Sequence, residues 1–246
     1  MLARSAEALF TGLIDYAGLF PPAALSMADA VHNYDAYRRG EYAWMLGRFV
    51  VPVAKMSEVP AGFPLALVAP LIETSVEQAP SPARGQAGAP DLHLYIESDD
   101  IDTLAARGLR AKIRTGGITP DAFPDASSIA RFIVRCAEKS VAFKATAGLH
   151  HPIRCVKPLT YEPDAPTGTM HGFVNLFMAA ALLNHAETIL GETDARAFEF
   201  GDDSASWRGH SVTTETLARV RSEFAISFGS CSFEEPIADL KEFGWL

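Results

Sequence analysis

Short strand-like runs that alternate with helical patterns are the feature that most constrains the fold of this chain. The seven runs are residues 44–51, 64–68, 92–97, 110–115, 141–147, 197–201 and 224–230. Strands that alternate with helices form a parallel sheet with helical crossovers. Seven candidates within 246 residues therefore predict an α/β fold of the TIM-like (β/α) barrel type, irregular or incomplete, rather than an open sheet.

The eighth strand that a complete barrel needs is not obvious in the sequence. It lies either in residues 153–157 or in the N-terminal segment, which would then close the ring. A doubly wound open sheet is the alternative, but the chain has no GxGxxG motif and no Walker loop to support it. The Pro-, Ala- and Gly-rich stretch 78–90 is interpreted as a long loop, so residues 1–246 are expected to form one domain.

Helical patterns fill several of the intervals between the strand candidates. The clearest covers residues 125–140, where apolar residues recur at helical spacing and Asp125 is the expected N-cap. Other helical patterns cover residues 101–107, 170–186 and 213–223. The first of these should end at Gly108. The second is apolar nearly all round, which predicts a buried helix.

Charge and cysteine content exclude several classes of function. The formal net charge is −9, from 30 acidic and 21 basic residues, so we expect neither nucleic acid nor an anionic membrane as a partner. No apolar run approaches the roughly 20 residues that span a bilayer. Three cysteines without CxxC spacing favour a reducing compartment, and we expect a cytoplasmic protein. The expected partner is a small-molecule substrate, and a homo-oligomer is left open.

Strand alternation gathers polar side chains on one face of the predicted sheet. These residues are Glu97, Lys112, Arg114, Lys144, Thr146 and Glu199. They lie late in their strands, near the carboxyl ends where barrel active sites are built. Because buried charges are costly unless they are paired, Glu97 and Glu199 are the expected partners of the lysines and the arginine. The alternative is that these charges only balance each other in a polar barrel centre.

Two lysine motifs are the most informative part of the sequence. The segments KIRTGG (112–117) and FKATAGLHHP (143–152) place Lys112 and Lys144 at two strand ends, 32 residues apart, with one helix between them. The pattern resembles the paired-lysine signature of deoxyribose-phosphate aldolases. The resemblance implies a barrel aldolase without a cofactor, in which Lys112 forms a Schiff base with the carbonyl substrate and Lys144 modulates it. It also implies late barrel strands, whereas the strand candidates place these lysines on the fourth and fifth of seven.

The whole chain also resembles a group of bacterial proteins. The segments that carry this second resemblance are LIDYAGLFPPA (13–23), KATAGLHHP (144–152), MHGFVNLFMAAAL (170–182) and FGSCSFEEP (228–236). It implies no particular reaction, so the lysine motifs remain the more informative signal.

Histidines follow the second lysine motif and open the apolar helical pattern. They are His150 and His151 at the strand end, and His171 with Asn175 one turn later. Imidazole transfers protons near neutral pH, and it can also bind a metal ion. No HxH, HExxH or CxxC spacing identifies a metal site in the sequence, and we assign no metal ligand.

Two further segments carry polar residues whose expected roles are structural or supportive. In the small-residue loop after the last strand candidate, Ser230 is expected to donate a hydrogen bond to an anionic group. Cys231 beside it is interpreted as a buried thiol, because the sequence assigns it no base. The N-terminal Asp15 and Tyr16 are interpreted as packing over one end of the barrel.

These observations leave three hypotheses for the function. The leading one is a cofactor-free, aldolase-like lyase or isomerase that acts on a small oxygenated carbonyl compound through the paired lysines. The alternatives are a metal-dependent hydrolase or lyase that uses His150 or His171, and a non-catalytic protein that binds an anionic metabolite. The expected catalytic residues are Lys112, Lys144, His150, His151 and Glu199. The expected substrate-binding residues are Glu97, Arg114, Thr115, Thr146, His171, Asn175 and Ser230.

Overall fold

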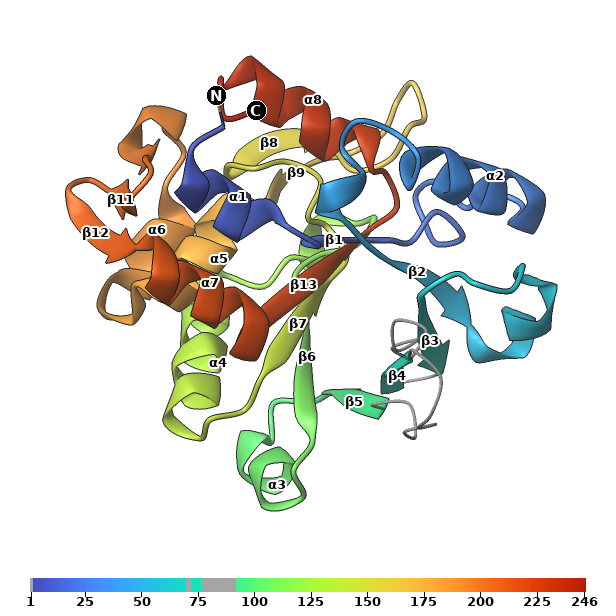
Figure 1. Cartoon of the computed structure of the whole chain (residues 1–246), viewed down its shortest axis with the longest axis horizontal. Helices are drawn as coiled ribbons and strands as arrows, with labels where there is room; N and C mark the ends of the chain where they lie inside the picture. Colours follow the sequence, from blue (N-terminus) through green and yellow to red (C-terminus); the bar gives the residue numbers. More distant parts are fainter. Residues whose placement is uncertain (1, 70–71, 77–91) are drawn as a thin grey trace, which may run out of the picture.

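Strands from both ends of the chain meet in one curled sheet. The computed structural model describes residues 2–69, 72–76 and 92–246, so the predicted loop 78–90 lies outside the described residues. Eight strands are hydrogen-bonded in the ring order β1-β2-β3-β4-β5-β6-β7-β13, and β13 pairs with β1 (Figure 1). They are β1 (Ile14–Tyr16), β2 (Leu46–Pro52), β3 (Leu65–Ala69), β4 (Ile72–Val76), β5 (Leu92–Glu97), β6 (Arg110–Arg114), β7 (Phe143–Thr146) and β13 (Ala225–Ser230).

Seven of these eight strands are parallel to one another, which confirms the predicted mixed α/β class with a mainly parallel sheet. The exception is β4, which runs antiparallel to both β3 and β5. No strand was predicted at that position. Of the two candidates for the missing strand, the N-terminal segment joins the ring as β1, between β13 and β2.

Two of the predicted barrel strands lie outside the ring. The segment 153–157 contributes β8 (Cys155–Pro158), which forms a hairpin with β9 (Thr167–Met170). The segment 197–201 contributes β10 (Phe198–Phe200), in an antiparallel sheet with β11 (Ser204–Trp207) and β12 (His210–Thr213). The prediction of β10 as a barrel strand is wrong because its apolar face packs elsewhere: the Phe198 and Phe200 rings contact Trp245, and Phe200 also contacts Phe10.

Eight α-helices surround this sheet in the described part of the chain. They are α1 (Arg4–Phe10), α2 (Met27–Tyr37), α3 (Ile101–Ala106), α4 (Ala126–Glu138), α5 (Phe173–Ala181), α6 (Ala186–Gly191), α7 (Thr214–Glu223) and α8 (Glu234–Glu242). Short 3-10 turns are η1 (Ala43–Met45), η2 (Val53–Glu58), η3 (Pro120–Ala122), η4 (Leu183–His185) and η5 (Ala195–Ala197). None of the helices described is long and apolar enough to cross a membrane.

The predicted helices form where their sequence signals place them. The side chain of Asp125 accepts a hydrogen bond from the Ser128 amide and caps α4, as predicted. Helix α3 ends before Gly108, whose φ of +64° lies in the left-handed region that glycine tolerates. The predicted helix 170–186 is shorter, because α5 ends at Ala181 and α6 follows at Ala186.

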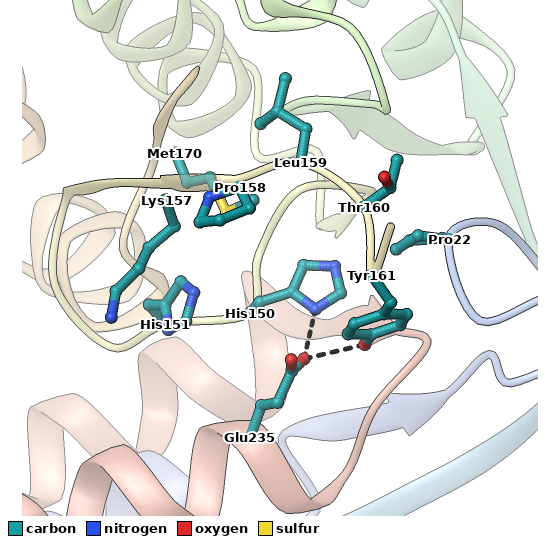
Figure 2. Close-up of a pocket in the computed structure, with 10 residues that line it drawn as sticks. All are labelled: Pro22, His150, His151, Lys157, Pro158, Leu159, Thr160, Tyr161, Met170 and Glu235. Atoms are coloured by element: carbon teal, nitrogen blue, oxygen red, sulfur yellow. Dashed lines mark hydrogen bonds and ion pairs between the residues drawn. The ribbon is translucent and has the colours of Figure 1, made fainter. Parts of the chain in front are cut away.

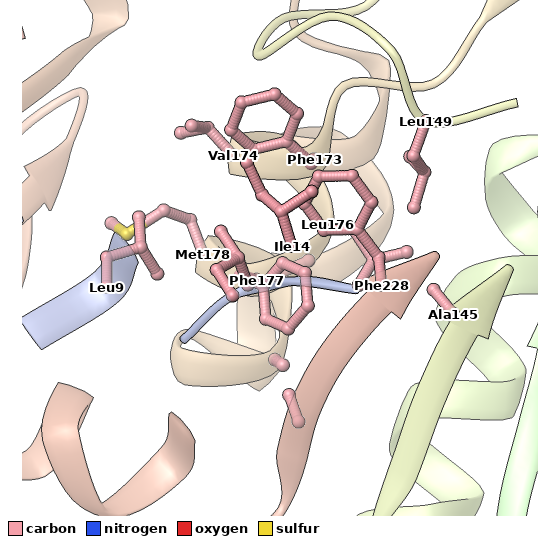
Figure 3. Close-up of a cluster of buried hydrophobic side chains, with 14 of the residues drawn as sticks. Leu9, Ile14, Ala145, Leu149, Phe173, Val174, Leu176, Phe177, Met178 and Phe228 are labelled. Carbon is pink, nitrogen blue, oxygen red and sulfur yellow. The ribbon is translucent and has the colours of Figure 1, made fainter. Parts of the chain in front are cut away.

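Helix α5 is buried nearly all round because it lies between the sheet and the neighbouring helices. Its Phe173 ring stacks on Phe228 of β13 with 5.0 Å between the ring centroids. Figure 3 shows these rings in one cluster with Ile14 of β1 and Leu9 of α1. The same core therefore holds the first and last strands of the ring together.

A helix cap provides a small test of this fold. The Thr213 side chain accepts a hydrogen bond from the Thr216 amide at 3.2 Å and caps α7. We expect Thr213→Ala to lower the free energy of unfolding by about 1 kcal/mol, because one amide at the helix start loses its acceptor. Urea unfolding followed by circular dichroism measures this. Thr213→Ser retains the hydroxyl and should be close to wild type; an equal loss in both variants would contradict the cap.

Candidate active site

Three charged side chains form a row across three neighbouring strands. In the strand register Glu97 of β5 is paired with Lys112 of β6, and Lys112 is paired with Lys144 of β7. Register partners on adjacent strands point to the same face of a sheet. Counted around the ring from β1, the lysines lie on the sixth and seventh strands. Their predicted position on middle strands is therefore wrong, because β1 and β4 were not counted.

The ammonium group of Lys144 is held by a buried carboxylate on β1. Its Nζ lies 2.6 Å from Asp15 Oδ2, and both side chains are almost completely buried. Asp15 also accepts hydrogen bonds from Ser227 Oγ at 2.8 Å and from the Arg48 amide at 2.6 Å. A Cβ atom at Gly47 would lie 2.2 Å from Asp15 Oδ1, so the absence of a side chain there makes room for this carboxylate.

Burial and charge act in opposite directions on Asp15. Desolvation alone would raise the pKa of this carboxyl group. The positive charges of Lys144 and Arg48, together with the hydrogen bonds from both residues, outweigh desolvation and hold the pKa below its ordinary value. Asp15 is therefore an ionised partner for Lys144, and the packing role predicted for it from the sequence is incomplete.

Lys112, in contrast to Lys144, borders a cavity at the carboxyl ends of the strands. The cavity has a volume of about 290 Å³. Its wall includes Lys112, Arg114, Thr146, His150, Gly229 and Cys231. These residues come from β6, β7 and β13 and the segments that follow them, so the cavity lies where the predicted active site was expected.

Arg114 and Glu97 form an ion pair beside this cavity. Arg114 donates from Nε to Glu97 Oε1 at 3.0 Å and from Nη2 to Oε2 at 3.3 Å. Lys112 Nζ lies 3.6 Å from the same carboxylate, which confirms Glu97 as the partner expected for the lysine and the arginine. The Arg114 side chain is 53% exposed, so its guanidinium is accessible to a ligand in the cavity.

The turn after β7 brings His150 to the cavity. Ala147 has a φ of +63° and Gly148 a φ of +72°, so the chain reverses through two left-handed residues. Thr115 Oγ1 donates a hydrogen bond to Ala147 O at 2.6 Å and holds this turn against the segment after β6. A Cβ atom at Gly148 would lie 2.8 Å from Gly116 Cα. The glycines of the two lysine motifs thus permit close contact between the two strand ends, and Thr115 is a positioning residue.

His150 lies between this cavity and a second one of about 210 Å³. Figure 2 shows the second cavity, where His150 Nδ1 lies 2.9 Å from Glu235 Oε2 and the Tyr161 hydroxyl donates to the same oxygen at 3.1 Å. Burial lowers the pKa of His150, but interactions with Cys231 and Glu235 outweigh this and raise it to about 9. Burial alone would raise the pKa of Glu235, but the hydrogen bond from His150 outweighs burial and holds this pKa below its ordinary value.

The pKa values imply that at neutral pH His150 is an imidazolium that donates its Nδ1 proton to the Glu235 carboxylate. Comparison with known proteins gives no further guide to this site. No protein-family model, curated protein or solved structure matches the chain.

The structure separates four of the predicted site residues from the lysine pair. His151 lines the second cavity and hydrogen-bonds through Nδ1 to Asp239 Oδ2 at 2.6 Å. Glu199 lies on β10, outside the ring, where Ser206 Oγ donates to it at 3.4 Å; its predicted place in the barrel interior is wrong because β10 is not a barrel strand. Asn175 lies in the first turn of α5 and His171 lies just before this helix, and both side chains form hydrogen bonds with other residues of the chain.

His171 and Asn175 use their polar atoms on structural partners. His171 Nε2 donates to Pro124 O at 2.7 Å, and Nδ1 accepts from Arg154 Nη1 at 3.1 Å. Burial and the Arg154 charge lower the pKa of His171, as these roles require. Asn175 donates to Ile189 O and Glu192 O, and its carbonyl accepts from the Arg154 amide. Both ring nitrogens of His171 are thus engaged, which argues against it as a metal ligand.

The remaining predicted residue, Ser230, is buried at the end of β13 and accepts a hydrogen bond from the Ser232 amide at 3.4 Å. In the described residues, no group of three or more His, Cys, Asp or Glu side chains is arranged to hold a metal ion. The sequence-based prediction did not include Asp15, Cys231 or Glu235 among the site residues. Each acts on a partner more than 80 positions away in the chain, and only the order of strands in the ring brings them together.

Proposed function

We propose that the chain is an irregular TIM-like (β/α) barrel enzyme, a cofactor-free aldolase-type lyase that forms a Schiff base with a small carbonyl compound. The observation that carries this proposal is the difference between two register-paired lysines. Lys112 borders the cavity, whereas Lys144 is buried and held by Asp15. One lysine is thus placed to contact a substrate, and the other supplies a fixed charge beside it. The proposed barrel is irregular because one of its eight strands, β4, is antiparallel to its neighbours.

The chemistry uses Lys112 Nζ as the nucleophile. The neutral amine adds to the carbonyl carbon, and the resulting carbinolamine loses water to give an imine. The imine withdraws electrons from the adjacent carbon, so the next carbon–carbon bond can break when the β-hydroxyl group loses its proton. The products are an aldehyde and an enamine on Lys112, and hydrolysis of that enamine restores the amine.

Neighbouring residues supply the other functions that this reaction needs. The Lys144 ammonium, fixed by Asp15, lies beside Lys112 and can donate the proton that the carbinolamine hydroxyl needs to leave as water. The neutral amine that remains can then accept the proton that the β-hydroxyl group loses when the carbon–carbon bond breaks. Arg114 lies at the cavity wall, where its guanidinium can bind a carboxylate or phosphate group of the substrate. His150, as an imidazolium, is an acid at the wall of the same cavity.

Borohydride trapping tests the proposal directly. The protein is incubated with a panel of small aldehydes, ketones and keto acids, reduced with borohydride, and mapped by peptide mass spectrometry. We expect at least one compound to leave a reduced adduct on Lys112. The exposed residues Lys55 and Lys157 report nonspecific reductive alkylation in the same sample. If no compound modifies Lys112 above the level of those two lysines, the proposal is wrong.

A further inference from the structure

A thiol, an imidazole and a carboxylate lie in a row at the wall between the two cavities. Cys231 Sγ lies 3.9 Å from His150 Nε2, and His150 Nδ1 lies 2.9 Å from Glu235 Oε2. Cys231 follows β13, and Glu235 lies in the first turn of α8, so a single short segment places both on His150. A nucleophile, a base and a group that orients the base have this arrangement in enzymes that use an activated cysteine.

The thiol and the imidazole face the cavity that Lys112 borders. Cys231 and His150 both line it, while Glu235 and Tyr161 lie on the side of the second cavity. Two polar groups face the sulfur: the His150 imidazole, with Nε2 3.9 Å from Sγ, and the Tyr161 hydroxyl, 3.7 Å from Sγ. The thiolate is the reactive form of cysteine, and a histidine within reach of the sulfur can take the proton of the thiol.

The other two cysteines lack such an environment. Cys136 lies on the buried face of α4, and burial raises the pKa of its thiol to about 12. Cys155 is only partly buried, yet burial raises the pKa of its thiol to about 11. Because His150 lies against its sulfur, we expect Cys231 to be the most reactive of the three thiols, although it is one of the less exposed ones.

We propose that Cys231 is a second nucleophile of this cavity, which adds reversibly to the carbonyl carbon of a small aldehyde and holds it as a thiohemiacetal. This inference rests on the proposed function, since cleavage of an aldol gives two carbonyl fragments. One fragment stays on the Lys112 nitrogen, and the other is the aldehyde that Cys231 receives. The ligand class of the thiol is thus a small aldehyde.

The addition balances without an oxidant or a leaving group. The Cys231 thiolate forms a carbon–sulfur bond, and the π bond of the aldehyde breaks toward oxygen. The His150 Nε2 proton moves to that oxygen and gives a hydroxyl group. The reverse step returns the proton to Nε2 and releases the aldehyde. Glu235 is a positioning residue, because it fixes the imidazole through Nδ1 and keeps Nε2 directed at Sγ.

Alkylation by iodoacetamide, mapped on all three cysteines, tests the thiol. We expect Cys231 to react at least about tenfold faster than Cys136 and Cys155 at neutral pH, since only the thiolate attacks this reagent and displaces iodide at a useful rate. His150→Asn should remove most of that difference. His32→Asn changes an exposed histidine of α2 and is the matched control, expected to leave the rate unchanged. Equal reactivity of all three thiols would overturn the inference.

Glu235→Gln separates a positioning role from a merely structural one. The pKa of His150, measured by nuclear magnetic resonance titration, should fall from about 9 in this variant, because the carboxylate no longer stabilises the imidazolium. The alkylation rate of Cys231 should fall with it. An unchanged His150 pKa in a folded Glu235→Gln protein would remove Glu235 from the cluster.

Competition with glycolaldehyde tests the ligand class and is performed in wild type and in Lys112→Met. We expect glycolaldehyde to slow alkylation of Cys231, but not of Cys155, in both proteins. Lys112→Gln replaces the methionine variant if that variant does not fold. A lysine adduct in wild type without protection of Cys231 in Lys112→Met would overturn this inference and leave the Schiff base intact. Protection in Lys112→Met without any lysine adduct in wild type would support the thiol site and overturn the proposed lyase.

Discussion

Asp15→Asn is expected to lower the free energy of unfolding by about 3–5 kcal/mol, the cost of removing one partner from a buried ion pair. The substitution keeps the shape of the side chain and an acceptor for the Arg48 amide, but it removes the negative charge that lies 2.6 Å from Lys144 Nζ. Lys144 is 1% exposed at its side chain, so water cannot replace that charge without opening the sheet. Urea unfolding at neutral pH, followed by circular dichroism, measures the loss.

The matched experiment is a double-mutant cycle. Lys144→Met leaves Asp15 as a buried carboxylate and should cost a similar amount. The Asp15→Asn/Lys144→Met protein contains neither charge, and we expect it to be more stable than either single variant. Asp203→Asn, which removes an exposed partner of Arg4, serves as the surface control and should not change stability measurably. Additive losses in the double variant would show that the two side chains are not coupled.

The same pair predicts a pH dependence of stability. The pKa of Asp15 is lower in the folded chain than in the unfolded chain, where it is about 3.9. Stabilisation by the pair is therefore complete above that pKa and is lost as the pH falls through the lower, folded-state pKa. In wild type the urea midpoint should decrease in this acidic range. The double variant should lack that part of the decrease.

Local signals in the sequence predict much of the fold but not the closure of the sheet. The stripe of α4 and its Asp125 cap are local features, and the structure contains both. Strands β1 and β4 are short, and their pairing partners decide whether they are strands at all. Their absence from the predicted count shifted both lysines from late strands to middle ones. Glu199 was misplaced for the opposite reason, since β10 has strand alternation but packs on α1 and Trp245.

The candidate site likewise combines features that the sequence predicts with contacts that it does not predict. Strand alternation was sufficient to predict that Glu97, Lys112 and Lys144 lie on one face of the sheet, because register partners on neighbouring strands point to the same face. The contacts of Asp15 with Lys144 and of Cys231 with His150 join residues 129 and 81 positions apart. No periodicity encodes such contacts. They follow from ring closure, which places β13 between β1 and β7.

Closure also explains why the N-terminal segment is part of the chemistry. Without β1 in the ring, Lys144 would lack its carboxylate, and its unbalanced charge would be costly to bury. The tight turn after β7 is matched to this arrangement, since Ala147 and Gly148 direct the chain from Lys144 to His150 within six residues. Strand β1 thus fixes the charge on Lys144, and the turn after β7 fixes the position of His150 at the cavity.

Substitution of each of the two lysines should show their different roles, because we expect both changes to have large effects on formation of the trapped adduct. Lys112→Met is expected to abolish the borohydride-trapped adduct, because the nucleophilic nitrogen at the cavity is gone. Loss of Lys144 should leave the adduct on Lys112 but slow its formation by about 10²–10⁴-fold, the usual contribution of a positioned proton donor. Single-turnover trapping, with the panel compound that modifies wild type, measures both rates.

The variant for Lys144 is best studied as Asp15→Asn/Lys144→Met, because that protein buries no unbalanced charge and is expected to fold. Lys157→Met, at an exposed lysine of β8, is the matched control and should trap at the wild-type rate. A Lys112→Met protein that still traps the compound, now on Lys144, would show that the buried lysine is the nucleophile. In that case the cavity-lining position of Lys112 would describe a substrate anchor, and Asp15 would be the group that must release Lys144 before it reacts.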